Sequence, residues 1–579
     1  MKSKTPKKNS GNGMPTVYVM LTYDCLYDDY DSVDVHTLLK GIPTICVLNF
    51  IVKKFGEVIY SLANNNKQRT FIREMCNHIK GEPRRRIWKF LNEQKQVYLI
   101  DSYGTILLEA LTLQNYTEID EDDDCLELCD DEYERVYKAL LYCNQRVTEL
   151  QQRNMTGCDL TELSLLVDVP YVEFKLYKDF ETQMFKAIKF FEFCEGNEHY
   201  CQGLKVFERE HGINDWKEYL TRLFAIVNSA LKSRYIKVDE SHYDDVAFFD
   251  QFVINLAECS NLWENWNAIT YFRNHFLLKL PKGLYLLLNA NFLVDKMYQG
   301  MRFDFFKTLK ENSICDSNGN IIRSYPDFIS DIGDKFSEHV LLYNFMKDVF
   351  GQRCDAIFTG EELKTMGIEA EPDLYMRIGK TLFLFENKDV TLSETVKYSA
   401  DVKSIKNEIF KKICKYEERS KKGAGQLHAT MEGIFKIGTF DEVDPGIKDV
   451  VEVFPIIVTT DRVFSAMGVN RLVIEEYSRI IEQHKIEVPV FISVPVIMDF
   501  DTIIKCGYRL KTGQFQLPEM LRKYILYNEG NLGPFNTFVI DEYINKLRYE
   551  PKSTEFLLGD FVESINRDAR KSVKNNLTI

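Results

Sequence analysis

The sequence has no Cys-x2-Cys pair, although it contains 14 cysteines. The closest spacing is Cys125-x3-Cys129, which lies inside an acidic segment. Structural zinc sites need ligands at tight, paired spacing, and none of the nine histidines completes such a set. We therefore expect no zinc site, and we interpret the cysteines as core or surface thiols in a reducing compartment.

Long hydrophobic runs are also missing. Val488–Ile497 is among the longest, and it is well short of the ~20 apolar residues that a membrane-spanning helix needs. No apolar segment follows the lysines at the N-terminus, so we expect no signal peptide. There is no fixed-period repeat and no long Gly/Ser or Pro linker. These absences predict a soluble, cytoplasmic protein without a membrane partner.

What the sequence does contain is typical of a globular protein. Hydrophobic residues make up 45% and charged residues 28% of the 579 positions. A chain of this length is too long for one ordinary domain, so we expect two to four. The net charge of −14 argues against a basic surface over the whole molecule, but one local basic patch is enough to bind nucleic acid.

Changes in composition along the chain divide it into five segments. The 17 positions of Glu118–Glu134 include 11 acidic residues, which we interpret as a solvated loop; a nucleic-acid mimic or a metal-sequestering segment is the alternative. Helical periodicity dominates from Glu132 to Leu293, and short apolar strands begin after residue 350. The expected segments are a loose basic tail (1–15), an α/β or α region (16–130), a mainly helical region (131–320), an α/β domain (321–510) and a C-terminal helical extension (511–579).

The α/β domain is predicted from the order of its elements. Helices are expected at about 334–350, 393–416, 426–435 and 470–483. Strands are expected at 355–358, 372–378, 381–387, 453–459 and 488–496. The core order of one helix, three strands, helices and a strand predicts a mixed sheet flanked by helices, with one more helix and strand added.

The most informative segment is a hairpin around Gly379. Glycine in the first central position suits a two-residue type II′ turn, which pairs Ile378 with Thr381. The two residue numbers of every cross-strand pair then add up to the same total, which fixes each partner along the hairpin. On this register Asp373 lies directly opposite Glu386, with Cβ atoms ~4.5–5.5 Å apart.

This register places charges at the end of a buried strand. Residues 381–385 are apolar on both faces, so the strand is expected to be central in the sheet. Lys388 projects from the same face as Glu386. Two carboxylates and an ammonium are costly to bury, and a divalent cation bridging Asp373 and Glu386 would offset that cost, with Lys388 beside the nucleophilic water. A surface hairpin with a salt bridge is the alternative.

Pro372-Asp373, followed after twelve residues by Glu386-Asn387-Lys388, resembles the signature of the PD-(D/E)XK nuclease superfamily. The resemblance covers about residues 336–496 and implies a nuclease domain with an αβββαβ core at 321–510. It also implies that Asp373 and Glu386 bind Mg²⁺, for which Mn²⁺ can substitute, and that Lys388 assists the activation of water. The carbonyl of Asn387 is a further metal ligand implied by the same resemblance.

Two residues outside the hairpin fit this resemblance. Glu338 shares a helix face with apolar residues, and superfamily members often carry an acidic metal ligand on this helix; a helix-start glutamate is the alternative. Gln426 resembles the glutamine that many members place on the helix after the third strand, although a plain polar helix position gives the same pattern. RecB-like members have Tyr four positions later, where this chain has Thr430, so exonuclease or endonuclease behaviour stays open.

Basic residues gather just before Gln426. Between Asp401 and Gly425 there are eight Lys and Arg against four acidic residues. Such an excess is typical of a surface that follows a phosphate backbone, and also of a solvated amphipathic helix. Arg84–Arg86 with Trp88 is a second, weaker candidate. The predicted nucleic-acid-binding residues are Lys411, Lys412, Lys415, Lys421 and Lys422.

The sequence thus predicts a Mg²⁺-dependent nuclease that hydrolyses phosphodiester bonds, with DNA as the favoured substrate. A large unassigned region fused to such a nuclease suggests a restriction or phage-defence role by analogy. The alternative is a catalytically inactive protein of the same fold that binds nucleic acid or protein. Strandedness, cleavage specificity and homo-oligomerisation are left open. The expected catalytic residues are Asp373, Glu386, Lys388 and Gln426, and the expected metal ligands are Glu338, Asp373, Glu386 and Asn387.

Overall fold

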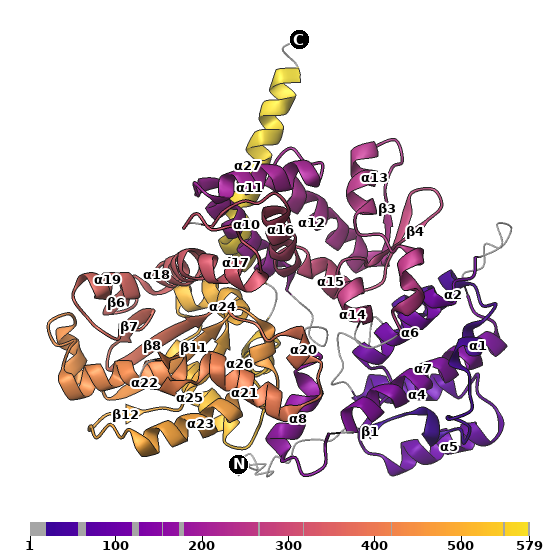
Figure 1. The fold of residues 1–579 in the computed structure, drawn as a ribbon, viewed down its shortest axis with the longest axis horizontal. Coiled ribbons are helices and arrows are strands. Elements are labelled where there is room, and N and C mark those ends of the chain that lie inside the picture. Colours follow the sequence, from indigo (N-terminus) through magenta and orange to yellow (C-terminus); the bar gives the residue numbers. More distant parts are fainter. Residues whose placement is uncertain are drawn as a thin grey trace, which may run out of the picture.

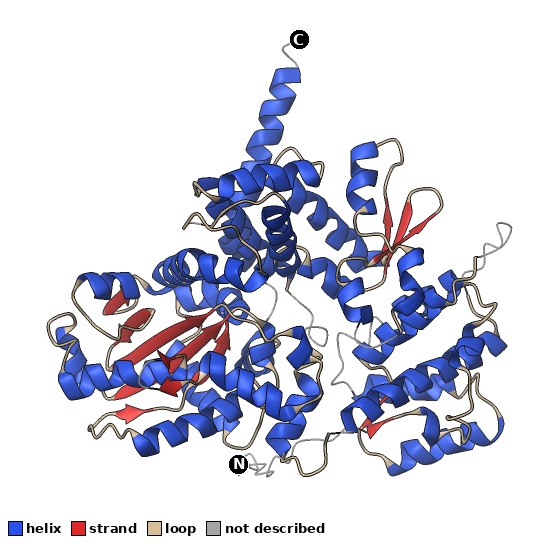
Figure 2. Ribbon diagram, in the orientation of Figure 1, coloured by secondary structure: helices blue, strands red, loops and turns tan. Residues whose placement is uncertain are grey.

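The structure is a computed structural model that describes residues 19–55, 65–118, 127–152, 154–172, 179–263, 267–316, 318–417, 420–547 and 550–576. The predicted basic tail, residues 1–15, lies outside these ranges. Figure 1 shows an α/β domain beside helical regions from the N-terminal half, and Figure 2 shows that most strands belong to that domain. Among the described residues no helix combines the length and the apolar character needed to cross a bilayer.

The α/β domain is built on a mixed six-stranded sheet with the order β12-β11-β8-β7-β6, in which β13 also pairs with β11. β7 is antiparallel to β6 and β8, whereas β8, β12 and β13 run parallel to β11. The predicted mixed sheet flanked by helices is confirmed. The strands are β6 (Ala356–Thr359), β7 (Leu374–Ile378), β8 (Thr381–Lys388), β11 (Glu452–Thr459), β12 (Phe491–Ile492) and β13 (Val496–Asp499).

The last predicted strand is interrupted. The sequence predicts one strand at 488–496, whereas the structure has the two short strands β12 and β13. Pro495 lies between them and has no N–H to donate to the ladder, so pairing stops there. Both short strands still add to β11 in parallel, and the sheet topology is unaffected.

Two of the predicted helices also differ in detail. The helix expected at 334–350 is a π-helical segment, η4 (Gly333–Tyr343), that continues into α18 (Asn344–Phe350). The helix expected at 393–416 is divided into α20 (Glu394–Lys397) and α21 (Val402–Ile413). Between the two helices Ala400 has a φ of +53°, which a continuous helix does not allow, and the side chain of Asp401 then caps the second helix by accepting from two backbone N–H groups.

β8 is buried on both faces, as its apolar run predicts. Leu382 and Leu384 belong to a core formed with α21, α22 (Ala424–Glu432) and α23 (Val469–Gln483). Phe383 and Phe385 belong to the opposite core, formed with α18, η4 and α24 (Phe500–Thr512). The sheet is therefore the middle of three layers.

Helices from the N-terminal half complete both outer layers. α8 (Leu160–Asp168) packs against α21 and α23, and Lys406 of α21 forms an ion pair of 2.8 Å with Glu162 of α8. On the other face α10 (Phe180–Gly196) packs against α24 and η4. The apolar core is thus continuous across residue 320, where the sequence predicts a domain boundary.

The other elements are mostly helical. The end of the acidic run departs from the expected loop, because Asp130, Asp131 and Glu132 form the first turn of α7, where the helix dipole favours acidic side chains; residues 119–126 lie outside the described residues. A short parallel pair, β1 and β2, and an antiparallel sheet, β3-β5-β4, accompany these helices. Their bounds are β1 (Val19–Met20), α1 (Val35–Leu39), α2 (Thr44–Phe50), α4 (Asn65–Met75), α5 (Gly81–Glu93), β2 (Val97–Tyr98), α6 (Ser102–Gln114), α7 (Asp130–Gln152), α11 (Tyr200–Glu210), α12 (Trp216–Ser233), β3 (Tyr235–Lys237), α13 (Tyr243–Asp250), α14 (Asn267–Phe272), β4 (Leu277–Leu280), β5 (Leu284–Leu287), α15 (Ala290–Asp295), α16 (Gln299–Glu311), α17 (Tyr325–Ile332), α19 (Gly360–Thr365), α25 (Leu517–Asn528), α26 (Phe535–Val539) and α27 (Pro551–Asn576).

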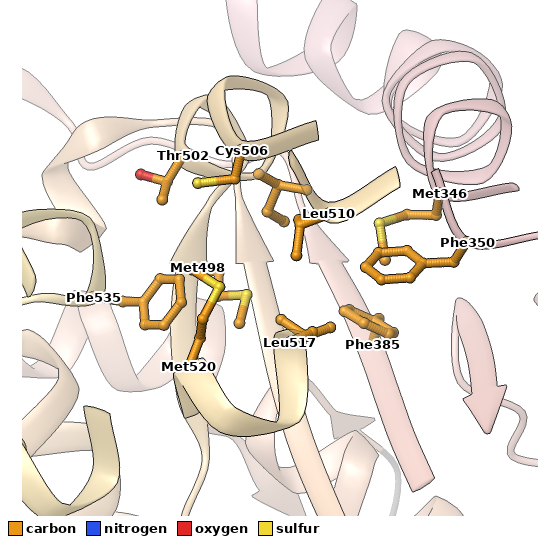
Figure 3. A pocket seen from close by; sticks show the side chains of 11 residues that line it. Met346, Phe350, Phe385, Met498, Thr502, Cys506, Leu510, Leu517, Met520 and Phe535 are labelled. Atoms are coloured by element: carbon orange, nitrogen blue, oxygen red, sulfur yellow. The ribbon is translucent and has the colours of Figure 1, made fainter. Parts of the chain in front are cut away.

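A small cavity lies between the sheet and the layer that contains α18 and α24. Figure 3 shows side chains of Met346, Phe385, Met498 and Leu517 around it. Its volume is about 20 Å³, and nearly all of its lining is apolar. A space of that size and polarity is a packing defect that stays dry, so it is no candidate ligand site.

Candidate active site

The β7–β8 hairpin has the predicted register. Gly379 has a φ of +59°, as the first central position of a type II′ turn requires. Ile378 pairs with Thr381 and Leu374 pairs with Phe385. One step further along the same register, Asp373 lies opposite Glu386, at the edge of the sheet where β8 ends.

Two contacts connect the residues of the motif. The backbone N–H of Asn387 donates a hydrogen bond of 2.6 Å to Oδ2 of Asp373. The ammonium of Lys388 forms an ion pair with Oε1 of Glu386, whose side chain is fully buried. Asp373, Glu386 and Lys388 therefore form one cluster, as the register predicts.

Glu338 belongs to the same cluster. It lies on η4, which packs against β8, and Oε2 of Glu338 accepts a hydrogen bond of 3.2 Å from the hydroxyl of Tyr343. Burial, together with the charges of Asp373 and Asp334, raises the pKa of Glu338 to about 8. Tyr343 holds this carboxylate from about one helical turn away, and no motif in the sequence points to it.

The electrostatics of the cluster are unfavourable for its carboxylates. Burial, with the nearby charge of Asp373, raises the pKa of Glu386 well above its ordinary value. Burial also raises the pKa of Asp373, against the opposing effects of Lys388 and of the Asn387 N–H. Burial lowers the pKa of Lys388, but the charges of Glu386 and Asp373 outweigh it and leave that pKa raised. Three acidic groups thus lie close together around Lys388, with Lys364 as a further cation near Asp373.

The donor set of the cluster fits a hard divalent cation. Oε2 of Glu386 is buried and has no hydrogen-bond partner in the described part of the molecule. Carboxylate oxygens are the ligands that Mg²⁺ and Mn²⁺ prefer. Among the described residues, however, no three His, Cys, Asp or Glu side chains already form a complete metal-binding group. The residues suit such an ion, but Glu386 contacts Lys388 instead of converging with the other carboxylates.

Gln426 lies on α22, which packs against β8 and β11. One turn further on, the hydroxyl of Thr430 donates a hydrogen bond of 2.8 Å to the carbonyl of Ala370. Residues four apart on a helix share one face, so Gln426 lies on the face that meets the segment leading into Asp373. This placement is compatible with the predicted role of Gln426, and a contact with the carboxylates stays a prediction.

The five predicted nucleic-acid-binding lysines differ in their surroundings. Lys412 pairs with Glu408 at 3.0 Å, and Lys415 pairs with Glu417 at 2.9 Å. Lys421 lies over the ring of Tyr416, with Nζ 5.1 Å from the ring centroid. Lys411, Lys421 and Lys422 are exposed. The surface charge available to a phosphate backbone is therefore concentrated on these three lysines.

The second basic candidate, on α5, is partly neutralised. Both terminal nitrogens of Arg86 bind the carboxylate of Asp28, at 2.8 and 2.7 Å, and Arg85 pairs with Glu82 at 3.1 Å. Trp88 is 44% exposed on the same helix. In Figure 1 α5 lies on the opposite side of the molecule from the α/β domain, so a nucleic-acid contact there would be separate from the carboxylate cluster.

The residue after the motif, Asp389, was not identified from the sequence. Its side chain is buried and pairs with Arg302 of α16 at 2.8 Å. The only sequence signal is one more acidic residue after Lys388, and nothing near Arg302 connects it with a segment 87 positions later. No known protein family, curated protein or solved structure matches this chain.

Proposed function

We propose that the protein is a metal-dependent nuclease of the PD-(D/E)XK type that hydrolyses phosphodiester bonds, with DNA as the substrate. The observation that carries this proposal is the meeting of Asp373, Glu386 and Lys388 at the buried end of β8, where Oε2 of Glu386 has no partner in the described residues. Burying these groups is costly, and an inert sheet edge has no need of them.

Each residue has a distinct role in the proposal. The side chains of Glu338, Asp373 and Glu386, with the carbonyl of Asn387, would hold Mg²⁺ or Mn²⁺. When bound, such an ion lowers the pKa of a water molecule and neutralises charge that develops on the phosphate. The Asn387 N–H fixes the orientation of Asp373, and Tyr343 fixes Glu338.

Lys388 supplies the mobile positive charge. Its ammonium is held by Glu386, and on substrate binding it would donate to a phosphate oxygen or to the attacking water. The water oxygen forms a bond to phosphorus, the bond to the leaving oxygen breaks, and the leaving oxygen takes up a proton. Gln426 would orient the substrate from α22. A restriction or phage-defence setting is part of the proposal by analogy only.

A second candidate is a catalytically inactive nuclease-fold protein that binds nucleic acid or protein. The ion pair between Lys388 and Oε1 of Glu386 favours it, because the ammonium already balances the charge of that carboxylate without a metal. So does the absence, among residues that the structure describes, of a complete metal-binding group.

Cleavage assays on the full-length protein separate the two candidates. Linear and circular duplex DNA, single-stranded DNA and RNA are incubated with Mg²⁺, Mn²⁺, Ca²⁺ or EDTA. Cleavage that needs Mg²⁺ or Mn²⁺ and disappears in Glu386→Gln supports the nuclease. The matched control is Glu475→Gln, which alters an exposed carboxylate on α23 and should cleave like the parent. Nucleic-acid binding without cleavage under every metal condition would favour the inactive protein and refute the nuclease.

A further inference from the structure

Asp389 joins four segments of the protein at one buried point. Its carboxylate accepts hydrogen bonds from Arg302 of α16 at 2.8 Å, from the hydroxyl of Ser337 on η4, and from the hydroxyl of Thr460 after β11. Asp389 itself follows Lys388, the last residue of β8. The carboxylate is 7% exposed, so water contributes little to its solvation.

Two of these partners, Ser337 and Thr460, are next to a part of the carboxylate cluster. Ser337 immediately precedes Glu338, and Thr460 follows Thr459, which pairs with Lys388 across the β8–β11 ladder. A hydrogen bond to Ser337 therefore fixes the helix that carries Glu338 against the strand that carries Glu386. Asp389 thus links the segment that carries Glu338 to the strand that carries Glu386.

Arg302 is the charged partner that holds Asp389 in place. Its side chain is fully buried, its Nη1 donates to the hydroxyl of Tyr298 at 3.1 Å, and its guanidinium lies 5.2 Å from the Tyr298 ring centroid. A planar guanidinium fixed by two partners leaves the carboxylate little freedom to rotate. Loss of the arginine would leave a buried carboxylate without its cation, which a protein avoids by moving the carboxylate.

A second buried ion pair shows how the helical region is held on this face. Lys186 of α10 pairs with Asp501 of α24 at 2.5 Å, and Gln183 donates to the same carboxylate at 2.7 Å. The ammonium of Lys186 lies 4.2 Å from the ring centroid of Tyr298, on which Arg302 also rests. This pair crosses the same interface, but none of its members is adjacent in sequence to a candidate metal ligand.

We propose that Arg302 is a positioning residue through which the helical region completes the metal site: by orienting Asp389 it sets the placement of Glu338 against Glu386. The inference rests on the proposed nuclease function and extends it, because it makes the site dependent on α16. The site is then shared between the α/β domain and the helical region, and a separated α/β domain would hold metal poorly.

The test measures Mn²⁺ binding to the substrate-free, full-length protein by calorimetry, beside its melting temperature. Partners that orient ligands in this way typically contribute 10–100-fold in metal affinity, so Arg302→Gln should weaken Mn²⁺ binding by at least about 10-fold. Arg302→Lys keeps the charge and should restore part of the affinity. Lys186→Gln is the matched control: it should lower the melting temperature and leave the Mn²⁺ affinity of the folded protein unchanged.

The outcomes separate this inference from the proposed function. If Arg302→Gln does not fold, Ser337→Ala removes one hydrogen bond to Asp389, and it should weaken Mn²⁺ binding severalfold with little loss of melting temperature. If the parent binds Mn²⁺ and cleaves nucleic acid, but the Arg302 and Ser337 variants bind Mn²⁺ like the parent, the positioning role is refuted and the nuclease stands. If the parent binds no Mn²⁺, both the nuclease and the positioning role are refuted.

Discussion

Replacing Glu338 by glutamine should stabilise the metal-free protein in a pH-dependent way. Burial and neighbouring carboxylates raise the pKa of Glu338 from 4.5 to about 8. Between these values the folded protein holds a proton that the unfolded chain has released, so the stability contributed by the protonated group is lost as pH rises through this window. Glutamine has no charge to lose and removes this penalty.

The size of the effect follows from the pKa. At 1.36 kcal/mol for each pKa unit, the rise from 4.5 to about 8 sets an upper limit of about 5 kcal/mol. Glu338 is only half-buried, and screening by water reduces the expected gain to about 2–3 kcal/mol above pH 8. Well below pH 4.5, where glutamate is protonated in both states, the gain should vanish.

Urea unfolding in EDTA at several pH values between 4.5 and 9 measures this gain. Glu475→Gln, whose exposed carboxylate pairs with Arg471, should change stability by less than about 0.5 kcal/mol at every pH. A loss of stability at pH 9 in Glu338→Gln, or a gain that is the same at all pH values, would show that Glu338 is not part of a crowded acidic cluster.

Three further predictions concern the cluster and its surface. Glu386→Gln should abolish cleavage and weaken divalent-ion binding in calorimetry, whereas Lys388→Ala should abolish cleavage and retain or tighten that binding, because a neighbouring positive charge is gone; parent-like cleavage by both would contradict the nuclease assignment. Tyr343→Phe removes the hydrogen bond to Glu338 and should weaken Mn²⁺ binding about 10-fold, and an unchanged Kd would reduce Tyr343 to a packing role. A triple glutamine variant alters the three predicted nucleic-acid-binding lysines that are exposed, which are Lys411, Lys421 and Lys422. Its log-log salt dependence of DNA binding should flatten by about 2–3, with little change in kcat, and an unchanged slope would place the binding surface elsewhere.

Local patterns were enough to predict the sheet and the hairpin. Gly379 needs a positive φ, and the two-residue turn that it begins fixes the pairing, so the register that brings Asp373 to Glu386 followed from about fifteen residues. The breaks at Pro495 and Ala400 were missed for different reasons. Proline chemistry was available in the sequence and was outweighed by the apolar run, whereas an alanine with positive φ leaves no sequence signal.

Contacts between distant segments could not be predicted in the same way. The sequence around Arg302 reads as an ordinary helix and gives no sign of a distant partner, although Arg302 pairs with Asp389, 87 residues later. The same holds for α8, whose apolar side chains would fit any core and which packs on the sheet domain through α21 and α23. Single-sequence patterns specify the faces of elements, but they do not specify which buried faces meet.

Protons and a divalent cation would compete for the same carboxylates. In the metal-free protein, burial keeps the pKa values of Glu338 and Glu386 high, so the cluster stores protons that a bound cation must displace. Metal affinity should therefore rise with pH through about 8, over the range in which the metal-free protein loses stability. A cation with a Kd of about 0.1 mM, present at 1 mM, would raise the free energy of unfolding by about 1.4 kcal/mol, because it binds the folded state. An inactive scaffold would lose stability as pH rises and would gain none from a cation, because Lys388 already pairs with Oε1 of Glu386 in its place. The pH dependence of stability with and without metal thus distinguishes a site that binds metal from one in an inactive scaffold, and the measurement needs no substrate.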